Sequence, residues 1–237
     1  MHEVVDLKVL YFGTPVVLLG TRNEDGSPNV APMSSAWWLG DSCMLGMGNN
    51  SQTAANLLRE RECVLNLAPS SMADAVDRLA LLTARSEIPE YRVRQGYRYE
   101  RDKFGAAGLT EQAAELVGAP RVEECPVQLE CVVTTHHPFG DPEPDATAFQ
   151  ARVVRAHVAK DLVIPGTRYV DPVAWDPLIM KFCEFFGGGR NVRPSRLAEG
   201  WGMPHELADR RGQTAGPAPL AALDSSHSSP IDRRRAG

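Results

Sequence analysis

The strongest constraint on the fold is a turn sequence between two strand-like runs near the N-terminus. Residues 16–19 and 29–33 are apolar or strand-forming, and residues 23–27, Asn-Glu-Asp-Gly-Ser, separate them. The Asp25-Gly26 pair can take the positive backbone angles that a tight turn between antiparallel strands requires. The chain is therefore predicted to open on a β-hairpin.

The β character continues beyond the hairpin and is interrupted by one short helix. Residues 37–48 form a further strand-like run, and residues 49–51 carry side-chain oxygens of the kind that cap helices. An apolar face at helical spacing follows over residues 53–61. Residues 63–67 return to a strand pattern, which Pro69 is expected to end.

The second half of the chain is predicted to add a pair of strands after a long connection. Apolar and polar residues alternate over residues 127–133, and β-rich composition returns over residues 149–158, so these two strands are expected to pair. Residues 86–103 are rich in tyrosine and arginine and follow neither a helical nor a strand period. That segment is predicted to be a long loop or insertion.

Two further helices are predicted in this half. One covers residues 72–85, where apolar side chains recur on one face. The other begins at Asp176-Pro177 and ends at Gly187. Its apolar stripe, which is expected to dock on the sheet, consists of Leu178, Ile179, Phe182, Phe185 and Phe186.

Composition limits the compartment and the partners. A formal net charge of −5 gives no general attraction to nucleic acid. No run of about 18 apolar residues occurs, so no membrane-spanning helix is expected. The five cysteines are odd in number and scattered, which indicates reduced thiols. We therefore expect a cytoplasmic protein whose partners are small molecules.

The chain is expected to contain one domain and a tail. Residues 1–202 are long enough to bury a stable core. From Met203 onward the composition is dominated by glycine, proline, alanine, serine and arginine, with little apolar surface to bury. Residues 203–237 are therefore predicted to form a disordered C-terminal tail.

Two stretches suggest a ligand site when they are read together. In residues 29–38 an apolar strand turns at small and hydroxylic residues, which let a ligand approach the backbone; a strand edge with a proline-terminated bulge is the alternative. Residues 48–53 place hydroxyl and amide groups at a helix N-terminus, where the helix dipole favours an anion such as phosphate. Simple helix capping is the alternative for this second stretch.

In this order and at this separation, the two stretches resemble the flavin reductase-like family of FMN-binding split barrels. The resemblance covers roughly residues 5–187. In the first half of the chain the resemblance rests on four groups of residues: Pro15–Gly20, Asp25-Gly26 with 29–34, Thr53 with Asn56-Leu57, and 64–67. In the second half it rests on three more: Lys103 with 108–110, 123–126 with 129–131, and 152–158.

The resemblance implies a fold and a cofactor site. The fold is a mainly β, six-stranded antiparallel split β-barrel with flanking helices, assembled as a homodimer with flavin mononucleotide near the subunit interface. The flavin contacts that it implies are Ala31, Pro32, Met33, Ser34 and Ser35 in one segment, and Asn49, Asn50, Ser51 and Thr53 in the other. It is silent on metal, and no metal site is predicted, because Cys125 and Cys131 are too far apart for a zinc pair and Cys131 fits a strand pattern.

The activity that the resemblance implies is flavin-dependent oxidoreduction, with NADH or NADPH passing hydride to flavin and the flavin then reducing an acceptor. The alternative is an FMN-binding electron carrier or sensor without a nicotinamide site. Many relatives carry charged residues just before the phosphate-loop threonine, whereas Asn50, Ser51 and Gln52 are neutral here. Phosphate affinity is therefore expected to be lower than in those relatives unless Lys103 or an arginine of residues 85–101 reaches the phosphate.

His157 is the candidate catalytic residue. It lies at the end of a strand that matches the family's terminal strand signature, a neighbourhood that faces flavin and nicotinamide in relatives. Its residue type fits equally well a histidine that is hydrogen-bonded at a barrel rim. The tyrosine- and arginine-rich residues 91–101 likewise fit either a stacking surface for a nucleotide or a solvated insertion packed on the barrel.

Overall fold

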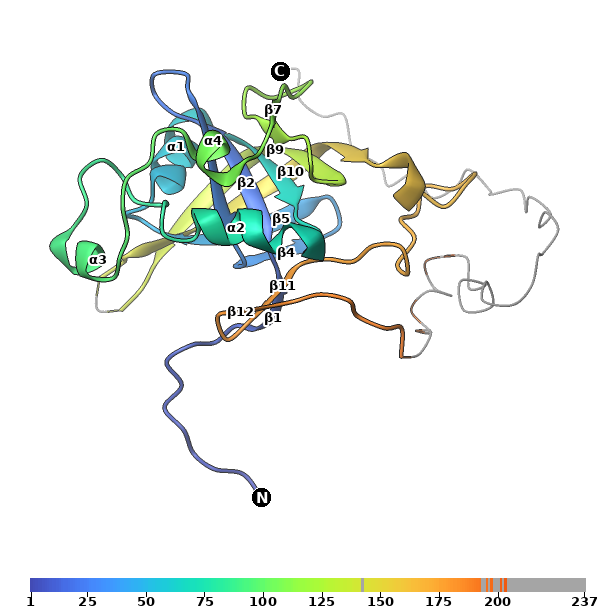
Figure 1. Cartoon of the computed structure of the whole chain (residues 1–237), viewed down its shortest axis with the longest axis horizontal. Helices are drawn as coiled ribbons and strands as arrows, with labels where there is room; N and C mark the ends of the chain where they lie inside the picture. The colour runs from blue at the N-terminus through green and yellow to red at the C-terminus, as the bar shows by residue number, and fades with distance from the viewer. Residues whose placement is uncertain (142, 193–194, 196, 198–200, 202, 204–237) are drawn as a thin grey trace, which may run out of the picture. The chain divides into compact units, whose positions relative to one another are not determined.

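The computed structural model describes residues 1–141, 143–192, 195, 197, 201 and 203 (Figure 1). The chain divides into two units, residues 1–192 and 193–237, and every helix and strand named below lies in the first. In the second unit the Trp201 amide donates to the Leu197 carbonyl at 3.3 Å. Except for Met203, the tail predicted over residues 203–237 falls outside the described residues.

The main sheet is antiparallel and has seven strands in the order β3-β2-β6-β9-β10-β5-β4. Its edge strands, β3 and β4, are separated by only Ser34 and Ser35 along the chain. The mainly β antiparallel fold is confirmed, with seven strands in the sheet where the sequence predicts six. The strands are β2 (Val17–Arg22), β3 (Pro28–Met33), β4 (Ala36–Leu39), β5 (Ser42–Gly48), β6 (Glu62–Leu67), β9 (Val127–Phe139) and β10 (Ala146–Val158).

Both predicted strand pairs are present. The turn between β2 and β3 is closed by a hydrogen bond from the Asn23 amide to the Ser27 carbonyl at 2.9 Å, and Gly26 takes a positive φ of 78°. Strands β9 and β10 pair along their length, with Val133 opposite Ala151. Local turn chemistry and two-residue alternation therefore identify these strands correctly.

Helix α1 (Gln52–Glu60) follows β5 and lies where the sequence predicts it. The Ser51 hydroxyl accepts a hydrogen bond from the Ala54 amide at 3.1 Å and caps its N-terminus. The helix ends at Arg61, whose φ is 58°. Ala54 and Leu57 face the inner core, so the short helix is held by packing as well as by its cap.

The sheet separates two main apolar clusters. The inner cluster includes Val17, Leu19, Leu45, Leu65, Cys131 and Phe149, all fully or almost fully buried. The outer cluster lies where helices α2 (Ala73–Leu79) and α4 (Lys103–Ala107) cover the other face of β2 and β3. It includes Val16, Leu18, Val30, Val76, Leu79, Phe104 and Leu109.

Helix α2 is shorter than the predicted residues 72–85. A 3-10 turn (Ser70–Met72) precedes it, and beyond Leu79 the chain becomes extended because Thr83 pairs with Tyr99 and the Leu81 carbonyl accepts from the Arg98 amide. Pairing with a distant segment therefore overrides the local helical period. The remaining short elements are α3 (Glu90–Arg94), β7 (Glu111–Gln112), β8 (Arg121–Val122) and a 3-10 turn (Lys160–Leu162).

The helix predicted from Asp176 to Gly187 is wrong. This segment forms β11 (Ile179–Lys181) and β12 (Glu184–Phe186), which join β1 (Phe12–Pro15) in a three-stranded sheet of order β1-β11-β12. Phe182 and Cys183, at the turn, both have positive φ, and the Phe182 ring contacts Phe12 at 4.9 Å between centroids. A short aromatic run fits the period of a helix as well as that of a strand, so pairing with β1 decides that this segment forms strands.

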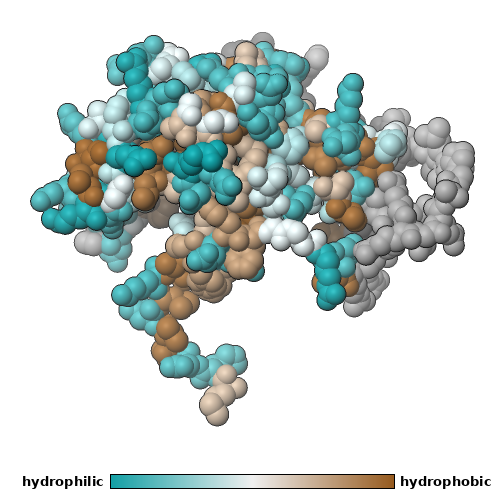
Figure 2. Space-filling model, in the orientation of Figure 1, coloured by the Kyte–Doolittle hydropathy of each residue, from teal (hydrophilic) through white to brown (hydrophobic). Residues whose placement is uncertain are grey.

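Apolar side chains gather on the outside of this small sheet. Phe12 is 64% exposed, and Phe182 and Phe186 are about half exposed. Figure 2 shows this apolar surface continuing from the N-terminal segment onto the region of β1, β11 and β12. Trp37 and Leu39 are exposed on the edge strand β4. Among the described residues, no helix is long and apolar enough to cross a membrane.

Candidate functional site

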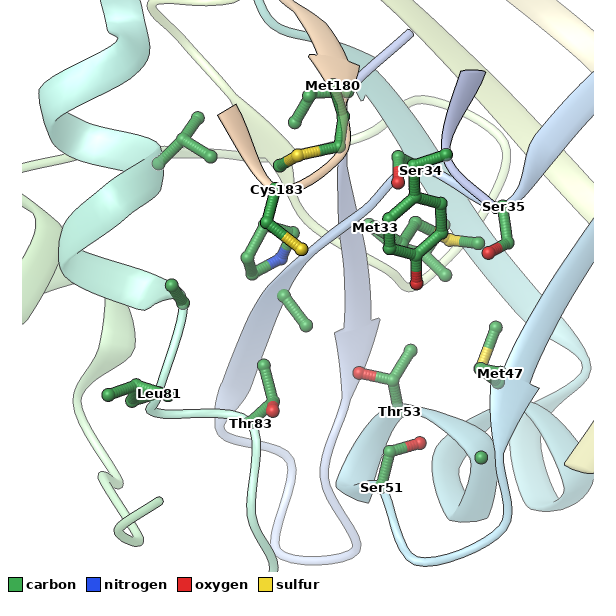
Figure 3. Close-up of a pocket in the computed structure, with 18 of the residues that line it drawn as sticks. Met33, Ser34, Ser35, Met47, Ser51, Thr53, Leu81, Thr83, Met180 and Cys183 are labelled. Carbon is green, nitrogen blue, oxygen red and sulfur yellow. The ribbon is translucent and has the colours of Figure 1, made fainter. Parts of the chain in front are cut away.

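A cavity of about 560 Å³ opens beside Ser34 and Ser35, the two residues that join the edge strands β3 and β4. Its walls come from the end of β3 and the following serines, the end of β5, the first turn of α1, the C-terminal end of α2, the loop around α3, and the β11–β12 turn. Figure 3 shows side chains from these elements pointing into the same space. A cavity of this size suits a cofactor-sized ligand.

One end of the cavity is apolar and rich in sulfur. Met33 is the last residue of β3, while Met180 and Cys183 enter from β11 and the turn after it (Figure 3). Tyr11 and Phe185 also line the cavity. Polarizable thioethers and aromatic rings form a surface that suits a flat aromatic ring system.

The other end is polar and lies at the N-terminus of α1. Ser51 and Thr53 line the cavity there, opposite Thr83 (Figure 3). The Ser51 hydroxyl accepts from the Ala54 amide and keeps its own hydrogen to donate. Arg85 donates to the Asn49 carbonyl at 2.8 Å and to the Ser51 carbonyl at 3.2 Å, which holds this loop by its carbonyl oxygens. Helix N–H groups and hydroxyl donors are the groups that bind an anion.

Arg92 also lines the cavity and comes from the tyrosine- and arginine-rich segment. Its guanidinium stacks on the Tyr97 ring at 4.0 Å from the ring centroid, and Tyr97 lines the cavity as well. Among the described residues no carboxylate forms an ion pair with Arg92, and no hydrogen bond occupies the donors of its guanidinium. The planar fork of donors is therefore available to a phosphate, the ligand that it matches best.

The structure brings most of the predicted flavin contacts together. Asn49 and Asn50, however, do not line the cavity. The Asn49 side chain accepts from Thr147 at 2.7 Å, and the Asn50 amide donates to the Tyr91 hydroxyl at 3.4 Å, so both residues shape the loop. The predicted residues that do line the cavity are Ala31, Pro32, Met33, Ser34, Ser35, Ser51 and Thr53.

Lys103 does not line this cavity either. It is 3% exposed, and its Nζ donates to Asn29 Oδ1 at 2.6 Å. It faces a second, smaller cavity of about 190 Å³ beside the β2–β3 turn. Asn29 belongs to a buried hydrogen-bonded network with Thr21, Thr53 and Asn56.

His157 lies apart from the cavity lining. Its Nε2 is 2.6 Å from Oε1 of Glu130, a fully buried carboxylate on β9. Glu130 also accepts hydrogen bonds from the backbone amides of Glu115, Leu116 and Val117. His157 thus contacts a carboxylate that anchors the loop after β7. This arrangement fits the alternative of a histidine that is hydrogen-bonded at the barrel rim.

The sequence does not single out Arg92, Tyr97 or Cys183 as cavity residues, although it offers an arginine of residues 85–101 for the phosphate and residues 91–101 as a stacking surface. The first two lie in the segment for which a solvated insertion was one alternative, and the signal for them was the interleaving of arginine and tyrosine. Cys183 lies in the segment for which the sequence predicts a helix, and that helix does not form. It is exposed, whereas the other four free cysteines are buried.

Comparison with known proteins gives this geometry a context. The model of the flavin reductase like domain matches residues 9–182. An uncharacterized protein of Bacillus subtilis (strain 168), YdfE, is 36% identical over 185 residues, which are 78% of this chain and 88% of that protein.

Two solved structures share the fold at low sequence identity. Flavoredoxin from Methanosarcina acetivorans is 18% identical, with a TM-score of 0.68 over 85% of this chain and 99% of that one. A Streptomyces globisporus NADH:FAD oxidoreductase, solved with NAD and FAD fragments, is 16% identical, with a TM-score of 0.53 over 78% of this chain and 88% of that one.

Proposed function

The chain belongs to the flavin reductase-like domain family, and from that premise we propose that it is an oxidoreductase that holds flavin mononucleotide in the 560 Å³ cavity and accepts hydride from NADH or NADPH. The observation that carries the proposal is that one cavity is lined by Ser51 and Thr53 at the N-terminus of α1 and, across from them, by the apolar and sulfur-containing side chains of Met33, Met180 and Cys183. Arg92 and Asp77 are the charged residues of its lining. Flavin mononucleotide suits such a lining, because a phosphate and a flat ring system lie at its opposite ends.

The residues present fit the phosphate. Ser51 and Thr53 can donate from the first turn of α1, and Arg92 brings a guanidinium without a carboxylate partner among the described residues. Hydrogen bonds from a charged donor to phosphate are about twice as strong as neutral ones. Arg92 therefore supplies the positive charge that the neutral loop of Asn50, Ser51 and Gln52 lacks.

The residues at the other end fit the ring system. Met33, Met180 and Cys183 provide polarizable contact surface, and the segment from Ala31 to Ser35 offers small side chains and backbone groups for close approach. When bound, the flavin supplies the hydride-accepting chemistry. The chain's own residues bind the cofactor, orient it and limit the access of water. No side chain in the cavity is required to act as an acid or a base.

The first test compares two arginines of the same short helix. Arg92→Met is expected to weaken FMN binding by about ten- to a hundredfold, the loss of one charge-assisted contact of about 1.5–3 kcal/mol, and to leave riboflavin binding nearly unchanged. Arg94→Met is the matched control, because Arg94 pairs with Glu90 on the helix surface and does not line the cavity. Equal losses in the two variants, or equal affinity of the parent protein for FMN and riboflavin, would contradict the phosphate site.

The second test addresses the reaction. Anaerobic absorption spectra of the FMN-loaded protein should show loss of the oxidised flavin band after NADH or NADPH is added. The fold of the Streptomyces oxidoreductase with NAD and FAD fragments supports this expectation. A flavin that neither nicotinamide reduces would leave the electron carrier or sensor as the function, without altering the cofactor assignment.

The homodimer is also part of the proposal. It is supported by the exposed aromatic side chains of Trp37 on β4 and of Phe12, Phe182 and Phe186 on the small sheet. Exposed aromatic clusters of this kind favour association.

A further inference from the structure

Lys103 is a buried ammonium with little to compensate its charge. Its side chain is 3% exposed, and its recorded hydrogen bond is to the neutral Asn29 amide at 2.6 Å. Among the described residues no carboxylate lies within ion-pair distance of it. Burial lowers the pKa of Lys103 to about 8, against the opposing effect of Glu100. A buried ammonium whose hydrogen-bond partner is neutral needs a further source of stabilisation for its charge.

The bond to Lys103 fixes the orientation of Asn29. An ammonium can only donate, so the Asn29 amide must turn its oxygen toward Lys103. Its Nδ2 then donates to Thr21 Oγ1 at 2.8 Å and to Thr53 Oγ1 at 3.2 Å. Because Thr53 Oγ1 accepts this bond, its own hydrogen points to a different acceptor. No acceptor for that hydrogen is recorded among the described residues, and Thr53 lines the main cavity.

We infer that Lys103 is a positioning residue for an anion in the main cavity: it acts through Asn29 to direct the Thr53 hydroxyl hydrogen into the cavity, and its charge is balanced when a phosphate accepts that hydrogen. The inference rests on the proposed flavin phosphate site. Lys103 itself does not line the main cavity, so it acts through two hydrogen bonds and not by contact.

Three carboxylates and one tyrosine line the small cavity with Lys103. Glu24 and Asp25 from the β2–β3 turn, and Tyr99 and Glu100 from the segment before α4, line the small cavity with it. Asp25 is bound by Arg101 at 2.8 Å. The residue of α1 that lines this cavity, Gln52, is neutral.

Two charged groups at the ends of neighbouring helices complete this environment. The Asp102 carboxylate caps α4 by accepting from the Gly105 amide at 2.8 Å. On α2, Arg78 donates to the Ala107 carbonyl at the far end of α4. Neither group is recorded in contact with the Lys103 amine.

The inference predicts that FMN binding takes up a proton. A phosphate that is stabilised by the ammonium raises the pKa of Lys103 in the complex, so the affinity is greatest below the pKa of the free protein and falls as the pH rises through about 8. If only the protonated form holds the phosphate well, the affinity falls by up to about tenfold between pH 7 and pH 9. Riboflavin, which lacks the phosphate, should show no such fall.

The experiment measures the affinities of FMN and riboflavin by fluorescence titration across this pH range. The FMN-to-riboflavin affinity ratio of the parent protein should fall with rising pH. Lys103→Met should give a low ratio that does not change with pH, and Lys103→Arg, whose charge is permanent, should restore a high ratio without the pH dependence. Arg98→Met is the matched control: Arg98 is an exposed cation of the same segment that lines neither cavity, so its removal should keep the parent profile.

A measurement on the parent protein covers the case in which the Lys103 variants do not fold. Calorimetric titration near pH 8 in two buffers of different ionisation enthalpy should show proton uptake with FMN and none with riboflavin. A preference for FMN that is independent of pH, without proton uptake, would overturn the role of Lys103 and leave the phosphate site standing. Equal binding of the two flavins would overturn both.

Discussion

Replacement of Glu130 by glutamine is expected to destabilise the fold by about 3 kcal/mol. The buried carboxylate accepts from the amides of Glu115 at 2.9 Å, Leu116 at 2.6 Å and Val117 at 3.2 Å, and it contacts His157 at 2.6 Å. Glutamine keeps one oxygen and turns an NH₂ group toward donors, so about half of these interactions are lost. Hydrogen bonds to charged groups contribute about 1.5–3 kcal/mol each, and rehydration of the loop recovers part of the loss.

The pH dependence of this loss has a defined sign. Burial alone would raise the pKa of Glu130, but hydrogen bonds from Glu115, His157 and Leu116 hold it below its ordinary value of 4.5. A carboxyl whose pKa is lower in the folded state stabilises the fold above its unfolded pKa, and this contribution is lost as the pH falls through the folded value. The difference between the parent protein and Glu130→Gln should therefore shrink below the ordinary value of 4.5.

Urea unfolding followed by tryptophan fluorescence measures the effect. Glu62→Gln is the matched control, because the Glu62 carboxylate accepts one hydrogen bond in the same loop, from the Gly118 amide at 2.7 Å, and its loss should cost about 1 kcal/mol. A loss for Glu130→Gln no larger than the control's, or a difference that does not change with pH, would refute the reasoning.

Three further predictions concern other parts of the chain. His157→Ala should lower the unfolding midpoint but leave FMN affinity unchanged in a fluorescence titration, since His157 bonds to Glu130 outside the cavity. A loss of FMN affinity with unchanged stability would return His157 to the flavin site. Light scattering at micromolar concentration should show a dimer, and Trp37→Asp should shift it toward monomer; a parent monomer would remove the homodimer from the proposal. Removal of residues 204–237 should leave the midpoint and FMN binding intact, because this segment is poor in apolar residues; a large drop in either would show that it packs on the domain.

Local chemistry was enough to predict the elements whose signals depend on nearby residues. Asp25-Gly26 predicts its hairpin because the turn needs a positive φ, which Gly26 takes. Ser51 predicts the start of α1 because its hydroxyl caps the helix three residues after β5 ends at Gly48. In both cases the deciding interaction lies within a few residues of the signal.

Elements that depend on distant pairing were not predictable in the same way. The run from Ile179 to Phe186 has aromatic residues that fit a helical stripe, but β1, more than 160 positions earlier in the chain, supplies the partner strand that makes it a hairpin. The end of α2 is set in the same way by the pairing of Thr83 with Tyr99. In both cases the partner lies outside the short stretch of residues in which a helical or strand period is detected, so the period alone does not predict the pairing.

The candidate site shows the same division between local and distant determinants. Ser51 and Thr53 could be predicted because a helix start presents its donors locally. The cation that would bind the phosphate could not, because six lysine and arginine residues lie between Arg85 and Lys103 and their sequence does not distinguish them. Four of these six bind protein oxygens: Arg85 at Asn49 and Ser51, Arg94 at Glu90, Arg101 at Asp25 and Lys103 at Asn29. Arg98 is exposed and does not line the cavity.

Arg92 alone among these six lines the cavity, and it keeps its donors because an aromatic ring, not a carboxylate, holds it in place. Stacking on Tyr97 positions the guanidinium without neutralising it, whereas an ion pair would have to be broken before a phosphate could bind. Tyr97→Leu should therefore weaken FMN binding less than Arg92→Met, because it removes the support for the guanidinium but keeps its charge. If the two losses are equal in fluorescence titrations, the stack itself and not the charge carries the affinity.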